Sequence, residues 1–217
     1  TVTPCRAVVP RSGEGIRWLK DAGPFCTIEP TTIMRNALGV FAATIVLASG
    51  PNSSVAQTTV SPDLKTVPDG TGWKGSIDVT RRVEKDGAVA IELNKPGQNV
   101  VWLEGFDFSD GSIEFDARGK SAPPQSSFVG GAFRVLDATS LDAIYFRPFN
   151  FRATDPGRKA HAVQYVSEPK WPWQKLRKEK PGQFENSIDP APDGDRWFHA
   201  RITIEGRRVK VFVNEGT

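Results

Sequence analysis

The stretch Gly111-Ser-Ile-Glu-Phe-Asp-Ala117 decides the fold class of this 217-residue chain. Apolar and polar side chains alternate along it, and a period of two is typical of a β-strand with one buried face. The apolar members are Ile113, Phe115 and Ala117, and the polar ones are Glu114, Asp116 and the following Arg118. Residues 106–108 also alternate, and the intervening Ser109-Asp-Gly111 turn predicts that the two segments form a hairpin.

The rest of the chain continues the same pattern. Short apolar or alternating runs between turn residues predict further strands at 88–93, 100–104, 128–136, 143–151, 162–166, 199–205 and 208–214. No segment between them has the 3.6-residue period of a long helix. We therefore expect an all-β fold, a two-sheet antiparallel sandwich. Because the last hairpin would leave an open edge near Thr217, we also expect about one to three further strands beyond the C-terminus.

The segment before residue 57 has the features of an export signal. Arg35 precedes an apolar run at 37–48, and Ser54-Val-Ala56 fits the small-x-small pattern of a cleavage site. This run is much shorter than the ~20 apolar residues that cross a membrane. We expect a signal peptide at 34–56, a secreted or periplasmic protein with no membrane segment after cleavage, and a folded domain at 57–217. Residues 1–33 are expected to lie outside that domain, as mistranslated upstream sequence or a disordered pro-segment.

Charge and cysteine content exclude several classes of function. The chain has 28 basic and 25 acidic side chains. Five of the basic and three of the acidic ones precede residue 57, so the domain contains 23 basic and 22 acidic side chains. A nearly neutral domain lacks the field that grips a polyphosphate backbone, so we expect no nucleic-acid partner. Both cysteines, Cys5 and Cys26, precede the domain, which excludes a disulfide framework, a thiolate metal site and a cysteine nucleophile within it. We expect no cofactor and leave Ca²⁺ open.

The segment Tyr145-Phe-Arg-Pro-Phe-Asn150 is the strongest candidate for a ligand site. Alternation places Tyr145 and Arg147 on one face of a strand, with Ile144 and Phe146 on the core face. Pro148 lacks an N–H and should distort the strand, as bulges do beside many active sites. Further polar side chains would widen this face into a sugar-binding cleft, namely Arg134, Asn150 and Gln164. The alternative is a ladder of polar cross-strand pairs on an exposed sheet.

The two histidines of the chain receive different interpretations. His161 begins a strand near Arg147 and is the candidate general acid or base. His199 follows Trp197 and Phe198, and we assign it a packing role. Two histidines do not make a metal site without carboxylate ligands, and the sequence contains no metal-ligand cluster.

A proline-rich segment, 167–196, interrupts the rhythm of short strands and is expected to be a long functional loop. Its Trp171 and Trp173 flank a proline. They either stack on sugar rings or pin the loop to the sandwich. Arg177, in the basic run that follows, would add a hydrogen-bond donor to the cleft.

Residues 111–214 resemble the concanavalin A-like lectin/glucanase superfamily. The resemblance rests on Gly111-Ser-Ile-Glu-Phe-Asp116, Phe128-Val-Gly-Gly-Ala-Phe-Arg134, Ala143-Ile-Tyr-Phe-Arg-Pro-Phe-Asn-Phe151, Ala162-Val-Gln-Tyr165, and Trp197-Phe-His-Ala-Arg-Ile-Thr-Ile204 with Val209-Lys-Val-Phe-Val-Asn214. The last unit is similar to the end of laminin G-like modules. Within the superfamily, the chain is most similar to the bacterial domain associated with 3-keto-disaccharide hydrolysis. The resemblance implies a jelly roll and a carbohydrate ligand, although lectins, glycosidases and adhesion modules share this fold.

One departure from the superfamily concerns its catalytic carboxylates. Laminarinase-type members carry a strand with the pattern Glu-x-Asp-x-x-Glu. Here Glu114 and Asp116 fill the first two positions, but Gly119 stands at the third. The two-carboxylate mechanism therefore lacks its acid/base partner. We interpret Glu114 and Asp116 as the solvated face of a strand.

The resemblance implies a secreted carbohydrate-active domain that hydrolyses or lyses a (3-keto-)glycoside. A ketone at C3 acidifies the adjacent C–H, so elimination could expel the glycosidic oxygen without the missing glutamate. In that scheme His161 or an acidic residue is the base, and Arg147 or Arg134 stabilises the enolate. The alternative is a non-catalytic lectin-like or adhesion module. A histidine and a carboxylate that meet in the cleft would favour the enzyme.

Overall fold

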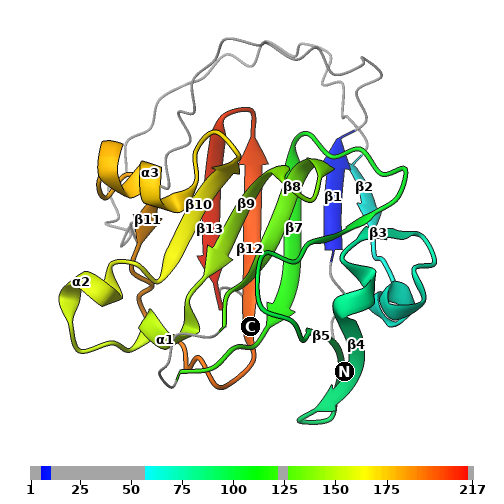
Figure 1. Cartoon of the computed structure of the whole chain (residues 1–217), viewed down its shortest axis with the longest axis horizontal. Coiled ribbons are helices and arrows are strands. Elements are labelled where there is room, and N and C mark those ends of the chain that lie inside the picture. Colours follow the sequence, from blue (N-terminus) through cyan, green and yellow to red (C-terminus); the bar gives the residue numbers. More distant parts are fainter. Residues whose placement is uncertain (1–5, 11–56, 122–126, 215–217) are drawn as a thin grey trace, which may run out of the picture.

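The computed structural model describes residues 6–10, 57–121 and 127–214, and over these ranges the chain is mostly β (Figure 1). Every pairing between the described strands is antiparallel. The larger sheet has the order β13-β12-β7-β1-β2. Its strands are β13 (Arg208–Val213), β12 (Phe198–Glu205), β7 (Gly111–Ala117), β1 (Arg6–Pro10) and β2 (Gln57–Val60). The expected all-β, antiparallel architecture is confirmed.

The second sheet has the order β11-β10-β9-β8 and carries the side chains that matter most below. Its strands are β11 (Glu185–Asn186), β10 (Val163–Glu168), β9 (Ser140–Phe146) and β8 (Val129–Asp137). Two small ribbons flank the sheets: β3 (Trp73–Gly75) with β6 (Val101–Leu103), and β4 (Thr80–Lys85) with β5 (Ala88–Leu93). The helices are short: α1 (Pro148–Phe151), α2 (Pro156–Lys159), α3 (Trp173–Glu179) and the 3₁₀ turns η1 (Leu64–Asp69) and η2 (Ile77–Val79).

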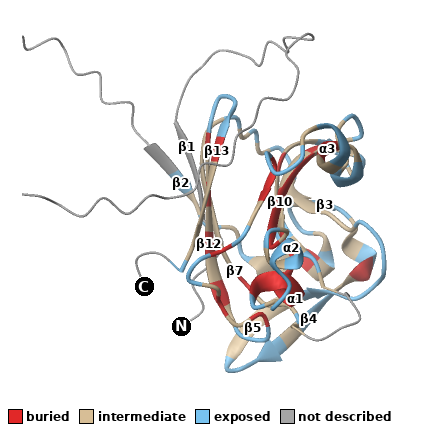
Figure 2. Cartoon of the chain, turned by 90° about the vertical axis from the view of Figure 1, so that its left-hand side faces the viewer, coloured by how far each residue is buried: buried red, intermediate tan, exposed pale blue. Residues whose placement is uncertain are grey.

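The hydrophobic core lies between the two sheets, and Figure 2 shows its buried residues on β10, β12 and around α1. Alternation along β12 buries Phe198, Ala200, Ile202 and Ile204. Phe146 of β9 meets the ring of Phe198 edge to face, with centroids 5.3 Å apart. Such aromatic pairs contribute about 0.5–1.5 kcal/mol beyond the burial of their area. Period-two alternation on both sheets therefore produces one shared core.

The structure corrects several boundaries that the sequence predicts. Residues 106–108 form no strand, so the predicted hairpin with β7 is wrong; β7 pairs instead with β12 and β1. Phe108 packs against the core, which explains why an apolar residue stands at this position although no strand forms. The strand expected at 143–151 ends at Phe146 because Pro148 begins α1. The segment expected to be a long loop contains α3 and β11.

The N-terminal segment contributes one strand to the larger sheet. The backbone of β1 pairs with β7 on one side and with β2 on the other, although we expected residues 1–33 to lie outside the domain. Residues 11–56, which include the predicted signal peptide, lie outside the described residues, and cleavage after Ala56 stays a prediction. Further strands beyond Thr217 also stay a prediction. No helix in the described part of the chain is long and apolar enough to cross a bilayer.

Candidate functional site

A pocket of about 130 Å³ lies at the end of β9, on the outer face of the second sheet. Ile144 and Phe146 of β9 are fully buried in the core, so the intervening Tyr145 points to the opposite face. Gln164 of β10 pairs with Tyr145, and Glu185 of β11 pairs in turn with Gln164. The residues that line the pocket are Phe128, Arg147, Asn150, His161, Trp173 and Arg177.

Close packing around Pro148 fixes where β9 ends. A Cβ atom at Gly119 would collide with the ring of Pro148, and one at Gly194 would collide with its carbonyl oxygen. The N–H of Gly119 donates to the carbonyl oxygen of Gly194 at 3.2 Å, which joins the two loops over the proline. This packing leaves no room for a side chain at position 119. A glutamate at 119 would collide with Pro148, the residue that follows Arg147 in the chain.

Arg147 is the central cation of the site and is only 6% exposed. Its Nη1 donates to the carbonyl oxygen of His161 at 2.9 Å, and its Nη2 donates to the hydroxyl of Tyr145 at 2.9 Å and to Oε1 of Gln164 at 3.4 Å. The guanidinium also lies 5.0–5.9 Å from three aromatic ring centroids, those of Tyr145, Trp173 and Phe128. Burial lowers the pKa of Arg147 from its ordinary value. A guanidinium nonetheless stays protonated in proteins.

Tyr145 is held in its neutral form beside this cation. Burial raises the pKa of Tyr145 to about 12, and the charge of Arg147 offsets only part of that effect. The protonated hydroxyl accepts a hydrogen bond from Arg147 and keeps its own proton to donate. Tyr145 therefore positions the guanidinium without forming an ion pair with it.

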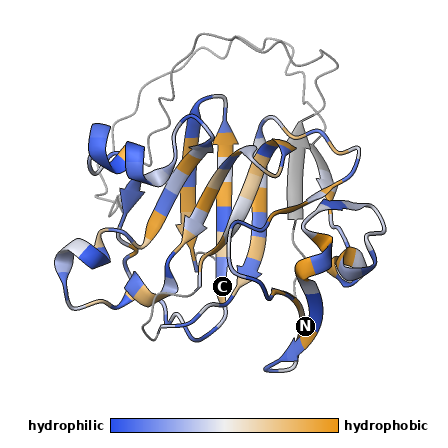
Figure 3. Cartoon of the chain, in the orientation of Figure 1, coloured by the Kyte–Doolittle hydropathy of each residue, from blue (hydrophilic) through white to orange (hydrophobic). Residues whose placement is uncertain are grey.

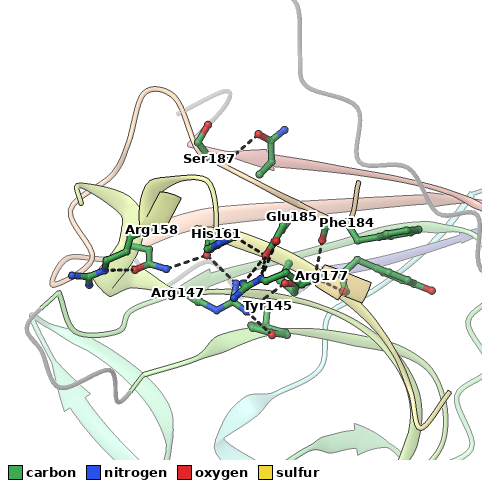
Figure 4. A network of polar contacts seen from close by, with 12 residues as sticks. Tyr145, Arg147, Arg158, His161, Arg177, Phe184, Glu185 and Ser187 are labelled. Atoms are coloured by element: carbon green, nitrogen blue, oxygen red, sulfur yellow. Dashed lines mark hydrogen bonds and ion pairs between the residues drawn. The ribbon is translucent and has the colours of Figure 1, made fainter. Parts of the chain in front are cut away.

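A buried carboxylate joins His161 to Arg177 (Figure 4). The side chain of Glu185 is 4% exposed. Arg177 donates to it through two nitrogens, Nε to Oε1 at 3.0 Å and Nη2 to Oε2 at 2.7 Å. Nδ1 of His161 lies 2.8 Å from Oε2, although the contact does not have the geometry of a hydrogen bond. No sequence pattern identified Glu185, because it lies on a two-residue strand inside the segment expected to be a loop.

Asn150 and Gln164 have different places in the site. Asn150 lines the pocket; its Nδ2 donates to the carbonyl oxygen of His161 at 3.3 Å, and its Oδ1 accepts from Nε of Arg158 at 3.3 Å. Gln164 is fully buried behind the pocket. Its Nε2 donates to the carbonyl oxygens of Tyr165 and Phe184 at 2.9 and 3.0 Å. Gln164 therefore supports Arg147, whereas Asn150 can reach a ligand.

Trp171 and Trp173 have different surroundings in the structure. Trp173 lines the pocket, with the guanidinium of Arg177 4.8 Å from its ring centroid. Trp171 packs against the core and carries the ammonium of Lys175 4.4 Å above its ring. Trp171 therefore packs against the sandwich, as one interpretation expects, whereas stacking of Trp173 on a sugar ring stays a prediction. Phe128, which the sequence did not single out, completes the aromatic lining.

Arg134 lies away from the pocket. A register shift between Phe133 and Asp137 interrupts β8, and Arg134 has a left-handed backbone with φ of 52°. Its guanidinium contacts Asp142 at 3.1 Å and the carbonyl oxygen of Gly206. The bulge therefore breaks the parity argument that grouped Arg134 with Arg147.

The acidic strand β7 is also remote from the pocket. Asp116 and Glu114 lie on the outer face of the larger sheet, where Nδ1 of His199 is 3.0 Å from Asp116 Oδ1 and its Nε2 is 3.8 Å from Glu114 Oε2. His199 thus contacts carboxylates on the outer face rather than packing in the core. Within the described ranges, no group of three or more His, Cys, Asp or Glu side chains is placed to hold a metal ion.

Comparisons with known proteins gave no match: no family model, no curated protein and no solved structure is similar to this chain.

Proposed function

We propose that the domain is carbohydrate-active and cleaves a glycoside in this pocket by removing a proton from a carbon next to a carbonyl group. The observation that carries the proposal is that His161, which lines the pocket together with Arg147, lies 2.8 Å from the buried carboxylate of Glu185. A base and a cation directed at one small cavity are the two groups that elimination requires. The resemblance to 3-keto-disaccharide hydrolases supports the same chemistry.

His161 is the base in this proposal. Glu185 lies next to Nδ1 and favours the tautomer with the proton on that nitrogen. Nε2 is then the nitrogen that accepts a proton from substrate. The buried carboxylate would also stabilise the imidazolium that forms, as an acidic residue does in other catalytic histidine pairs.

The chemical step proceeds in two stages. His161 takes the proton from the carbon next to the carbonyl, and the C–H electron pair moves into the carbonyl to give an enolate whose oxygen accepts hydrogen bonds from Arg147. The enolate electrons then form a carbon–carbon double bond as the bond from the next carbon to the glycosidic oxygen breaks. That oxygen leaves with the proton returned by His161. Addition of water to the double bond would complete a hydrolysis.

Aromatic rings would orient the sugar for this step. Trp173 and Phe128 lie on the wall of the pocket, and apolar faces of a pyranose ring pack on such rings. Asn150 offers an amide to a hydroxyl group. The pocket is small beside the ~300–1,000 Å³ typical of small-molecule sites, which suits one sugar unit with the remainder of the glycoside outside.

A non-catalytic glycan-binding module is the second candidate. It is favoured by the bidentate ion pair of Glu185 with Arg177, because that ion pair alone would explain a buried carboxylate at this position. In such a module the aromatic rings and amide would bind sugar, and His161 would only line the wall.

The proposal is tested with glycosides that carry a carbonyl group next to a ring C–H, such as a 3-keto-glucoside and a 4-linked uronic-acid disaccharide. We expect release of the leaving alcohol from at least one of them. Replacing that C–H hydrogen by deuterium should slow turnover, because the bond to it breaks in the proposed step. Binding without turnover of any substrate would support the second candidate. Turnover with no isotope effect at that carbon would contradict the elimination.

A further inference from the structure

The pocket contains one buried cation, Arg147, with which no carboxylate of the described residues forms an ion pair. Arg147 contacts only neutral acceptors: the carbonyl oxygen of His161, the hydroxyl of Tyr145 and the amide oxygen of Gln164. The nearby carboxylate of Glu185, which lies outside the pocket lining, forms its ion pairs with Arg177 and His161 instead. A buried ion without an opposite charge is costly, and proteins usually pair such groups.

The segment that forms one wall of the pocket is basic as well. Residues 170–180 contain five basic side chains and one acidic one, whereas the domain as a whole is nearly neutral. This segment includes α3, which Figure 3 shows as strongly hydrophilic, and α3 contributes Trp173 and Arg177 to the pocket. Lys178 is exposed on the same helix. Positive charge is therefore concentrated where a ligand would approach.

Arg147 also retains unused donors that suit a carboxylate. A guanidinium has five N–H groups, and the three hydrogen bonds of Arg147 to described residues use only part of them. The planar guanidinium matches the geometry of a carboxylate, and hydrogen bonds between ionised groups are stronger than neutral ones. A neutral ketone would accept these hydrogen bonds but would leave the charge unpaired.

We propose that the pocket takes an acidic sugar, and that the carbonyl oxygen held by Arg147 belongs to the carboxylate of a uronic-acid residue. This inference rests on the proposed function and narrows its substrate class from any carbonyl-bearing glycoside to uronides. The elimination is unchanged: the proton leaves the ring carbon that bears the carboxylate, and the oxygen that departs is on the next ring carbon. Arg147 pairs with the carboxylate before the reaction and with the additional negative charge during it.

Calorimetric titration with two matched sugars tests the inference. Methyl glucopyranoside and sodium methyl glucopyranosiduronate differ only at C6, where the second carries a carboxylate. We expect the uronate to bind at least about tenfold more tightly at low salt, the gain typical of a charged hydrogen bond. The advantage should shrink as ionic strength rises, because the pocket is partly open to solvent.

Variants of Arg147 test whether its guanidinium is the group that binds the carboxylate. Arg147→Gln should abolish the preference for the uronate, and Arg147→Lys should retain part of it. Arg81→Gln is the matched control, because Arg81 is exposed on β4 and pairs with Glu92 outside the pocket. Equal binding of glucoside and uronate by the unmodified protein, or a preference that persists in folded Arg147→Gln, would overturn the acidic-sugar inference. If the protein then still cleaves the 3-keto-glucoside with an isotope effect, the proposed function remains supported. If it cleaves none of the substrates, the proposed function is contradicted as well.

Discussion

Oε2 of Glu185 lies 2.8 Å from Nδ1 of His161 and 2.7 Å from Nη2 of Arg177. One buried carboxylate thus holds a histidine from the turn before β10 and an arginine from α3. The three side chains come from separate segments, which meet through the pairing of β10 with β11 and the contact of α3 with β10. Their geometry therefore depends on the fold rather than on local sequence.

The first prediction concerns that carboxylate. Glu185→Gln preserves the size of the side chain but removes the charge beside His161. We expect kcat to fall about ten- to a hundredfold, because the base loses its orienting and stabilising partner. KM should change less, since Glu185 does not line the pocket. Steady-state kinetics across a pH series checks this, and an unchanged kcat and pH profile would show that the carboxylate only supports Arg177.

A second prediction concerns the packing that ends β9. Gly119→Ala places a Cβ atom against Pro148, so the free energy of unfolding should fall by about 1–3 kcal/mol. Gly157→Ala is the control, because its nearest neighbour is a side-chain oxygen at 3.3 Å on the surface of α2. Denaturant unfolding measures both. Equal stability of the two variants would mean that the packing of Gly119 against Pro148 does not contribute to the free energy of unfolding.

The core offers a third prediction. Phe198→Ala removes a ring that packs against Phe146 and Phe151, and it should cost about 3–5 kcal/mol of unfolding free energy. Leu136→Ala truncates an apolar side chain that is 66% exposed, so its effect should be small. Thermal unfolding of the two variants should therefore differ clearly. Similar melting temperatures would argue against a core between the sheets.

Tyr145 gives a pH-dependent prediction. Its pKa is raised from 10.0 to about 12 in the folded chain, so the folded state holds this proton more tightly than the unfolded state does. Its contribution, about 2–3 kcal/mol, is fully present below pH 10 and is lost as pH rises towards 12. Tyr145→Phe should flatten the decline of unfolding free energy over that window. An identical decline in the variant would show that Tyr145 titrates normally.

Arg147 combines structural and ligand-binding roles, and this changes what its truncation should do. From sequence alone, removal of Arg147 is expected to affect ligand more than stability. Truncation to alanine would remove the donor to the partly buried hydroxyl of Tyr145 and to the buried amide oxygen of Gln164. We therefore expect Arg147→Ala to lower the unfolding free energy by about 1–3 kcal/mol as well as to weaken binding. Calorimetry and denaturant unfolding on the same sample check both effects.

The sequence predicts the parts of this protein that depend on local periodicity. Alternation along β7 and β12 identifies the core face correctly, and the parity of Ile144, Tyr145 and Phe146 places Tyr145 on the opposite face. Arg147, His161 and Trp173 were singled out from their neighbourhood in the sequence, and the structure places all three at one pocket. Local pattern was sufficient for these residues because each lies on or beside a regular strand or a proline-stiffened turn.

The remaining parts depend on contacts between distant segments. Glu185 reaches His161 only because a two-residue strand pairs with β10. Arg134 is displaced by a bulge, whose position depends on how β8 and β9 pair and not on the residues at the bulge alone. Gly119 has no room for a side chain because two loops close over Pro148. Such features arise from tertiary packing, which no period in the sequence encodes.

The central claim is that His161 acts as a base in this pocket, and the pair His161→Gln and His199→Gln tests it most directly. The chain contains only these two histidines, and both lie near carboxylates, but only His161 lines the pocket. With the glycoside that the unmodified protein turns over best, we predict that His161→Gln lowers kcat by about 10²–10⁴-fold while sugar binding persists. His199→Gln should keep its turnover. Undiminished turnover by His161→Gln, or equal losses in the two variants, would contradict the account.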